Sequence, residues 1–185
     1  MSNTTFVFHG SFGSPYENWF PWLHGVLASR GDTCFAPPFP TPVGQTFESW
    51  ARIVDAYRNN GLLNEESTLV THSSSAVFAV KYLTSRQVGI SKLITVSGFN
   101  QFFSGNEDFD RINSEFFVTE QDLKATNKYC KKAVSFLSSS DPYLPTGVLI
   151  SFASTIGAET IDVPSAGHFN SAAGFAEFPQ ILEHL

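Results

Sequence analysis

The stretch Ser67-Thr68-Leu69-Val70-Thr71-His72-Ser73-Ser74-Ser75-Ala76 is the part of this 185-residue sequence that decides its fold. Residues 68–71 are β-branched or apolar and predict a buried strand over 67–72, and an apolar run of helical length begins at Ala76. A strand that passes directly into a helix exposes the residue of its tight turn at the edge of the sheet. The stretch therefore predicts a sharp turn with Ser73 at its tip.

Similar apolar runs recur along the chain and alternate with stretches of helical pattern. The expected strands are 5–9, 33–36, 67–72, 92–97, 133–137 and 159–163, and the expected helices are 19–29, 46–59, 76–84, 122–129 and 147–156. Strands that alternate with helices pair in parallel through right-handed crossovers. We predict a three-layer α/β/α sandwich with a mostly parallel six-stranded sheet, formed by residues 1–185 as a single domain.

One connection, residues 98–132, is too long for an ordinary loop and contains no expected strand. It follows the end of a central strand, where ligands bind in sheets of this kind. We interpret it as a short lid. Its phenylalanines are Phe99, Phe102, Phe103, Phe109, Phe116 and Phe117.

The composition excludes several classes of protein. The chain is 42% hydrophobic and only 15% charged, which argues against disorder. Its formal charge of −6 argues against a nucleic-acid partner, which would need a basic face. No apolar run is long enough to span a membrane and no targeting segment is visible, so we expect a cytoplasmic protein. Two cysteines, Cys34 and Cys130, form no framework, and we expect reduced thiols.

Three polar residues follow three different expected strands. Ser73 follows 67–72, Asp141 follows 133–137 and precedes two prolines, and His168 follows 159–163. Their order along the chain, Ser-Asp-His, is typical of one class of serine hydrolases. In that chemistry an imidazole takes the proton of the serine hydroxyl, and a carboxylate orients the imidazole. We therefore predict that Ser73 is a nucleophile, His168 its base and Asp141 the acid.

The first expected strand ends in Phe8-His9-Gly10-Ser11-Phe12-Gly13, a turn that can supply a backbone N–H to an oxyanion. We predict that Ser11 (or Phe12) donates one such N–H and that Ser74 donates the second. His9 and His72 precede these groups, and we expect packed, hydrogen-bonded side chains beside the site. The residues predicted to line the substrate pocket are His9, Phe12, Trp19, His72, Phe99 and Phe169.

With these motifs, nearly the whole chain resembles the family of small single-domain serine hydrolases that includes the retinoblastoma-binding protein 9. The resemblance rests on His9-Gly10, Ser14-Pro15, Trp19, Trp22-Leu23, Pro37–Pro42, Trp50, His72-Ser73-Ser74, Asp141-Pro142-Tyr143-Leu144-Pro145, Gly167-His168-Phe169, Gly174-Phe175 and Phe178-Pro179. It implies a minimal α/β-hydrolase fold without a full cap, and it carries the catalytic roles to Ser73, Asp141 and His168. The sequence departs from the family at Thr71 and Ser75, where the family has glycine.

These observations favour a carboxylesterase that acts on small acyl esters through an acyl-enzyme on Ser73. One alternative is a non-catalytic binding module that retains the fold, which Thr71 and Ser75 favour. Another is a cofactor-free perhydrolase. We expect no cofactor, membrane or nucleic-acid partner, and no protein partner is indicated. His9, His72, Asp141 and His168 lack the spacing of a metal site, so we expect no metal.

Overall fold

A six-stranded sheet runs through the computed structural model, which describes residues 4–101 and 106–185. The strands are β1 (Thr4–Phe8), β2 (Thr33–Phe35), β3 (Thr68–His72), β4 (Ile90–Val96), β5 (Cys130–Leu137) and β6 (Glu159–Asp162). They lie in the order β2-β1-β3-β4-β5-β6, and every neighbouring pair is parallel. The predicted fold class, a three-layer sandwich around a parallel sheet, is confirmed.

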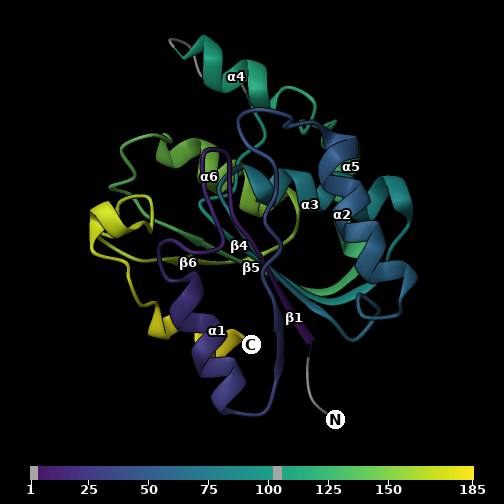
Figure 1. Cartoon of the computed structure of the whole chain (residues 1–185). Helices are drawn as coiled ribbons and strands as arrows, with labels where there is room; N and C mark the ends of the chain where they lie inside the picture. The colour runs from purple at the N-terminus through teal and green to yellow at the C-terminus, as the bar shows by residue number, and fades with distance from the viewer. Residues whose placement is uncertain (1–3, 102–105) are drawn as a thin grey trace.

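Helices cover both faces of this sheet (Figure 1). The α-helices are α1 (Phe20–Ser29), α2 (Phe47–Asn59), α3 (Ser74–Arg86), α4 (Glu107–Asn113), α5 (Glu120–Ala125) and α6 (Thr146–Thr155). Short 3-10 helices follow at η1 (Thr126–Lys128), η2 (Ser171–Ala173) and η3 (Pro179–His184). In Figure 1, α1 and the yellow C-terminal segment lie on one side of the sheet, while α2, α3 and α5 lie on the other.

Alternating side chains of the strands feed two separate cores. Along β1, Phe6 and Phe8 pack with Trp50 of α2 and with α3, whereas Val7 packs on the opposite face with α1. Burial on both faces explains why the central strands read as continuous apolar runs. Because the strands are all parallel, the residues that follow β3, β5 and β6 lie at the same edge of the sheet.

The expected helix 122–129 is divided between α5 and the 3-10 helix η1, and β4 and α3 begin two residues earlier than expected. Two further differences, at β5 and α4, have a clear cause in the sequence. Strand β5 begins at Cys130, because the exposed Lys131 and Lys132 hid its first residues from a hydrophobic pattern. Helix α4 was not predicted, since its seven residues are mostly charged or polar and show no apolar stripe. Its first turn is capped by Asn106, whose side chain accepts a hydrogen bond from the Phe109 N–H at 3.0 Å.

The connection between β4 and β5 projects from the body of the molecule at α4, at the top of Figure 1. Its base is fixed by Asn100, whose side chain donates to the Val118 carbonyl and accepts from the Val118 N–H, both at 2.9 Å. Phe99 and Phe116 are fully buried. Phe102 and Phe103, which we assigned to the lid, lie outside the described residues.

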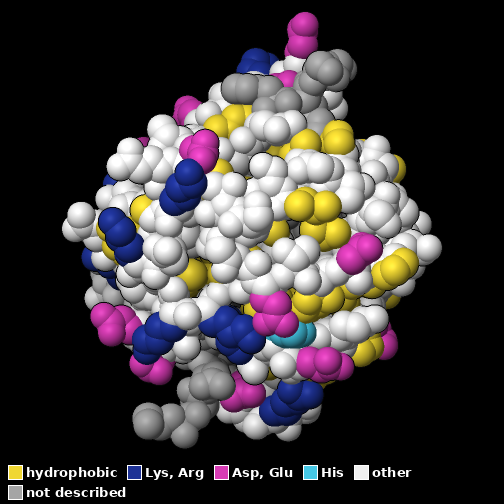
Figure 2. All heavy atoms as spheres, turned by 180° about the vertical axis from the view of Figure 1, so that it is seen from behind, with side chains coloured by type: hydrophobic (Ala, Val, Ile, Leu, Met, Phe, Trp, Pro, Cys, Tyr) yellow, Lys and Arg dark blue, Asp and Glu magenta, His cyan; other side chains and the backbone are white. Residues whose placement is uncertain are grey.

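The face of the molecule in Figure 2, seen from behind, carries basic and acidic side chains interspersed with one another. Lys131 pairs with Glu66 at 2.9 Å and Lys132 with Glu159 at 3.2 Å. Within the described part of the chain, none of the helices combines the length and the apolar character that crossing a bilayer requires.

Candidate active site

Ser73 occupies a strained turn between β3 and α3. Its backbone has φ 59° and ψ −128°, in the positive-φ region that side-chain-bearing residues rarely adopt. The turn is held because the Ser73 N–H donates to the Val96 carbonyl of the neighbouring strand at 2.8 Å. Backbone strain of this kind persists where the surrounding structure enforces it, and it is common at functional sites.

Thr71 and Ser75 fit this turn without displacing it. The Thr71 hydroxyl donates to the Ile94 carbonyl at 3.1 Å. The Ser75 hydroxyl accepts from the His72 N–H at 2.9 Å and lies 2.8 Å from the carbonyl oxygens of Phe8 and His72. Both hydroxyls are fully buried and satisfied, so the missing glycines do not disturb the local geometry.

Asp141 lies in the turn after β5, and its carboxylate accepts four hydrogen bonds. One carboxylate oxygen accepts from His168 Nδ1 at 2.8 Å and from the Ser97 hydroxyl at 3.0 Å. The other accepts from the N–H groups of Tyr143 and Leu144 at 2.9 and 3.1 Å. Burial by itself raises the pKa of Asp141, but the bonds from His168, Tyr143 and Ser97 outweigh it and leave the pKa below its ordinary value.

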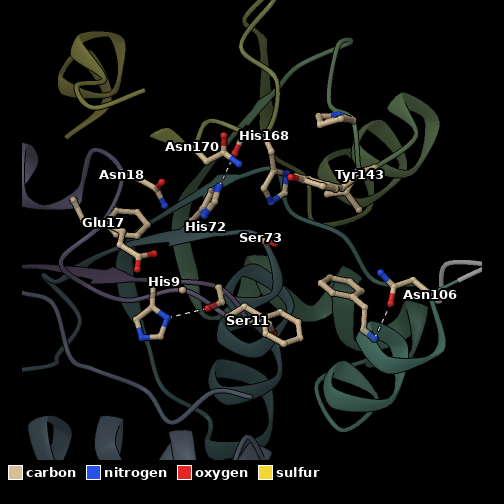
Figure 3. Close-up of a pocket in the computed structure, with 17 residues that line it drawn as sticks. His9, Ser11, Glu17, Asn18, His72, Ser73, Asn106, Tyr143, His168 and Asn170 are labelled. Atoms are coloured by element: carbon tan, nitrogen blue, oxygen red, sulfur yellow. Dashed lines mark hydrogen bonds between the residues drawn. The ribbon is translucent and has the colours of Figure 1, made fainter. Parts of the chain in front are cut away.

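His168 follows β6 on a loop that turns at Gly167. Gly167 has a φ of +54°, and a Cβ there would lie 2.9 Å from the Cβ of Ala173, so the turn requires glycine. Because the Asp141 carboxylate accepts, His168 Nδ1 carries the proton and Nε2 is the basic nitrogen. Among the described residues no direct hydrogen bond joins Ser73 Oγ to His168, although both side chains line one cavity (Figure 3). Such contacts are often long in unliganded sites.

The other two histidines of the site are structural. His72 Nε2 donates to the His168 carbonyl at 2.8 Å, and burial, together with the nearby His168, lowers the pKa of His72 to about 3. His9 Nδ1 donates to the Gly10 carbonyl at 2.8 Å while its Nε2 accepts from the Phe39 N–H at 2.9 Å. Burial also lowers the pKa of His9. Both rings are therefore neutral, and their hydrogen bonds hold the neighbouring loops in place.

The cavity in front of Ser73 has a volume of about 720 Å³. Of the six residues predicted to line it, His9, Phe12 and His72 do so. The prediction is wrong for Trp19, Phe99 and Phe169, which are fully buried in the cores. Trp19 donates its indole N–H to the Phe169 carbonyl at 3.0 Å, and Phe99 packs with Leu137 and Leu144 beneath the insertion.

Several lining residues were missed by the sequence-based prediction. Tyr143 and Leu144 follow Asp141 by two and three residues, and Asn170 follows His168 by two. Their closeness to the predicted catalytic residues could have indicated that they line the cavity. Phe109 and Asn106 belong to the insertion, and the sequence does not indicate which of its residues face the cavity. The described residues that line the cavity are His9, Gly10, Ser11, Phe12, Gly13, Glu17, Asn18, Phe20, His72, Ser73, Asn106, Phe109, Pro142, Tyr143, Leu144, His168 and Asn170.

The turn predicted to supply an oxyanion donor lies against Ser73. A Cβ on Gly10 would lie only 2.8 Å from Ser73 Cβ, so the turn packs directly on the serine. The predicted donors need correction, however. The Ser11 N–H already donates to Ser74 Oγ at 2.9 Å, and the Phe12 N–H donates to Thr41 Oγ1 at 2.8 Å. Neither is free in this conformation, because side chains that are distant in sequence accept from them.

The Ser74 N–H is in a different position, as the first residue of α3. The first N–H groups of a helix have no acceptor within the helix, and the helix dipole favours a negative charge there.

Within residues 4–101 and 106–185, no group of three His, Cys, Asp or Glu side chains could hold a metal ion.

Comparisons with known proteins show what the chain is similar to. The model of a family described as serine hydrolase matches residues 5–185. YdeN of Bacillus subtilis (strain 168), named as a hydrolase, is 25% identical over 187 residues, with 100% of this chain and 95% of that protein covered. Serine hydrolase RBBP9 of Rattus norvegicus is 25% identical over 170 residues, which cover 91% of this chain and 87% of that protein. The crystal structure of the B. subtilis ydeN gene product has a TM-score of 0.86 at 24% identity, over 99% of this chain and 96% of that one.

Proposed function

The chain belongs to the serine hydrolase family, and from this premise we propose that it is a carboxylesterase that cleaves small esters through an acyl-enzyme on Ser73. The observation that carries the proposal is the 2.8 Å hydrogen bond from His168 Nδ1 to a buried Asp141 carboxylate, on the same cavity as a strained Ser73. A polarised imidazole that lines the same cavity as a turn serine is the arrangement that activates a hydroxyl.

The proposed reaction has two halves. Ser73 Oγ attacks the ester carbonyl, and its proton passes to His168 Nε2. Asp141 stabilises the imidazolium through the bond to Nδ1. Collapse of the tetrahedral intermediate breaks the bond to the alcohol, which leaves with the proton from His168. Water then attacks the acyl-enzyme with His168 again as base, and the carboxylic acid leaves while the proton returns to Ser73.

The negative oxygen of the intermediate needs a hydrogen-bond donor. The Ser74 N–H at the start of α3 supplies one, because Ser74 directly follows the nucleophile. The Ser11 N–H can supply the second only if the oxyanion replaces Ser74 Oγ as its acceptor.

The cavity suits a small, partly apolar substrate. Phe12, Phe109, Tyr143 and Leu144 provide apolar or aromatic lining, and Phe12 and Tyr143 are more than half exposed at its mouth. Methylenes contribute about 0.8 kcal/mol each only while they are removed from water. We therefore expect acyl chains to gain from length for a few carbons and then to stop gaining.

A panel of p-nitrophenyl esters from acetate to palmitate, below micellar concentrations, tests this function. We expect kcat/KM to peak at about four acyl carbons, because further methylenes would extend into water and lose the gain of about 0.8 kcal/mol that burial gives each of them. Ser73→Ala should abolish turnover in a folded protein. Retained turnover in that variant would contradict the proposal, and activity that rises to the longest chain would contradict the small pocket.

The alternative of a non-catalytic binding module was favoured by Thr71 and Ser75, which replace the usual glycines. Both residues fit the turn through their own hydrogen bonds, so they no longer favour that alternative.

A further inference from the structure

Four polar side chains from distant parts of the chain meet beside the turn of residues 10–13. They are Ser11 of that turn, Gln45 of the loop before α2, Ser74 at the start of α3 and Asn113 at the end of α4. Ser11 and Ser74 are in contact through their hydroxyls at 2.8 Å, and Ser11 Oγ lies 2.7 Å from Asn113 Oδ1. Gln45 Nε2 donates to Ser11 Oγ at 2.8 Å and to Asn113 Oδ1 at 3.1 Å. We refer to these four residues as the turn network.

The hydrogen positions in the turn network follow from the capacity of each group. A hydroxyl donates one hydrogen bond and accepts two. Ser11 donates to Asn113, whose amide oxygen can only accept, so Ser11 accepts from both Gln45 and Ser74. Ser74 Oγ in turn accepts from the Ser11 N–H at 2.9 Å. The Ser11 hydroxyl is thus fully used, and its orientation is fixed.

Asn113 links this arrangement to the insertion. Its side chain is fully buried, accepts from Ser11 and Gln45, and donates to the Phe109 carbonyl within α4 at 2.8 Å. Gln45 Nε2 also lies 2.9 Å from the Ile112 carbonyl, so its two hydrogens are shared among three acceptors, of which Asn113 Oδ1 is the most distant. A buried polar network whose members are all satisfied specifies one arrangement, and the loss of one member leaves the others unpaired.

We propose that Asn113 is a positioning residue for the reaction, an inference that rests on the function proposed above. The turn that Asn113 holds packs on Ser73 at Gly10, and its Ser11 N–H is held against the residue that carries the other oxyanion donor. Phe109, on the same helix, lines the substrate cavity. Asn113 therefore sets the turn, the Ser74 hydroxyl and one wall of the cavity relative to Ser73, although it touches no substrate itself.

Asn113→Ala tests the proposal against a matched control, Asn100→Ala. Asn100 lies in the same insertion and also makes hydrogen bonds to its backbone, but its partner is Val118, outside the turn network. Both variants should lower the melting temperature. Because a misplacement of about 1 Å can cost about 10²-fold in rate, we expect Asn113→Ala to lower kcat by about 10- to 100-fold with KM nearly unchanged. Asn100→Ala should leave kcat within about twofold of the wild type, since it does not contact the turn.

A double-mutant cycle with Ser11→Ala identifies the route of the effect. If Asn113 acts through Ser11, adding Asn113→Ala to Ser11→Ala lowers kcat much less than it does in the wild type. Equal losses in both backgrounds, or equal kcat losses for Asn113→Ala and Asn100→Ala, would overturn the proposal. If Asn113→Ala does not fold, Gln45→Met tests the turn network instead. At similar volume it removes the donor to Ser11 and Asn113, together with the oxygen that accepts from the Thr41 hydroxyl. A lowered kcat at constant KM supports the proposal there, and an unchanged kcat overturns it.

The same assays separate this inference from the proposed function. A wild type that neither hydrolyses esters nor reacts with a fluorophosphonate at Ser73 refutes the function itself. A wild type that does both, with Asn113→Ala indistinguishable from Asn100→Ala, refutes only the positioning role.

Discussion

Two sides of the cavity meet at Ser73 and are built differently. The acid–base side, formed by Ser97, Asp141 and His168, centres on a buried carboxylate whose four partners neutralise the cost of its burial. The turn side, formed by Ser11, Gln45, Ser74 and Asn113, contains only neutral hydroxyls and amides.

This difference predicts how substitutions on each side should affect the reaction rate. A charge in a buried site interacts strongly with its surroundings, so a change on the acid–base side alters electrostatics and protonation directly. A change on the turn side removes no charge. It acts through the geometry of the turn, and its effects on rate should be smaller.

The largest effect is expected for Asp141→Asn on the acid–base side. An amide at this position favours the wrong tautomer of His168, and precedents in other triads suggest a loss of up to about 10⁴-fold in kcat. Steady-state kinetics with a p-nitrophenyl ester measures it, and circular dichroism checks the fold. Unchanged turnover in a well-folded variant would remove Asp141 from the acid role.

An intermediate effect is expected for Gly10→Ala on the turn side. The new Cβ would lie 2.8 Å from Ser73 Cβ and 3.0 Å from the His72 carbonyl oxygen, so the turn must move. We expect a loss comparable with that of one oxyanion donor, about 10²- to 10³-fold in kcat.

Gly25→Ala is the matched control for Gly10→Ala. It lies in α1, and nothing lies within 4 Å of its added Cβ. Its kcat should equal that of the wild type, with a slight gain in stability because alanine favours the helix. If the two variants have the same activity, the turn does not constrain the reaction.

A third prediction concerns stability, with a smaller effect. His72 has a pKa of about 3 in the folded protein against an ordinary value of 6.5. Between these values the unfolded chain binds a proton that the folded protein does not, so the free energy of unfolding falls as the pH drops from 6.5 toward 3. Above 6.5 His72 makes no such contribution to the pH dependence.

His72→Gln should therefore flatten the acid side of the stability curve. Glutamine can still donate to the His168 carbonyl, but it has no proton to gain in this range. Melting temperatures of both proteins from pH 7 to pH 4 measure the difference. Parallel curves would show that another group causes the acid sensitivity.

The two sides also differ in how far the sequence predicts them. The sequence pattern predicts the strands that precede Ser73, Asp141 and His168. Because these strands are parallel, the residues that follow them lie at one edge of the sheet. The turn side depends on contacts such as Ser11 with Asn113, which are 102 residues apart. No local pattern encodes such a pairing.

The errors in the predicted pocket have the same origin. Trp19, Phe99 and Phe169 are aromatic residues near the motifs, and hydrophobicity alone does not distinguish a core residue from a pocket residue. The Ser11 N–H was predicted as a free donor because its acceptor, the Ser74 hydroxyl, is set by side-chain packing rather than by the turn itself.

The account depends most on Ser73, the residue at which the two sides of the cavity meet. Mass spectrometry of the protein after reaction with a fluorophosphonate probe locates the nucleophile directly among Ser73, Ser74 and Ser75. We predict a single adduct on Ser73, because Ser73 lines the cavity while Ser74 and Ser75 are fully buried. An adduct on Ser74 or Ser75, with Ser73 unmodified, would contradict the account.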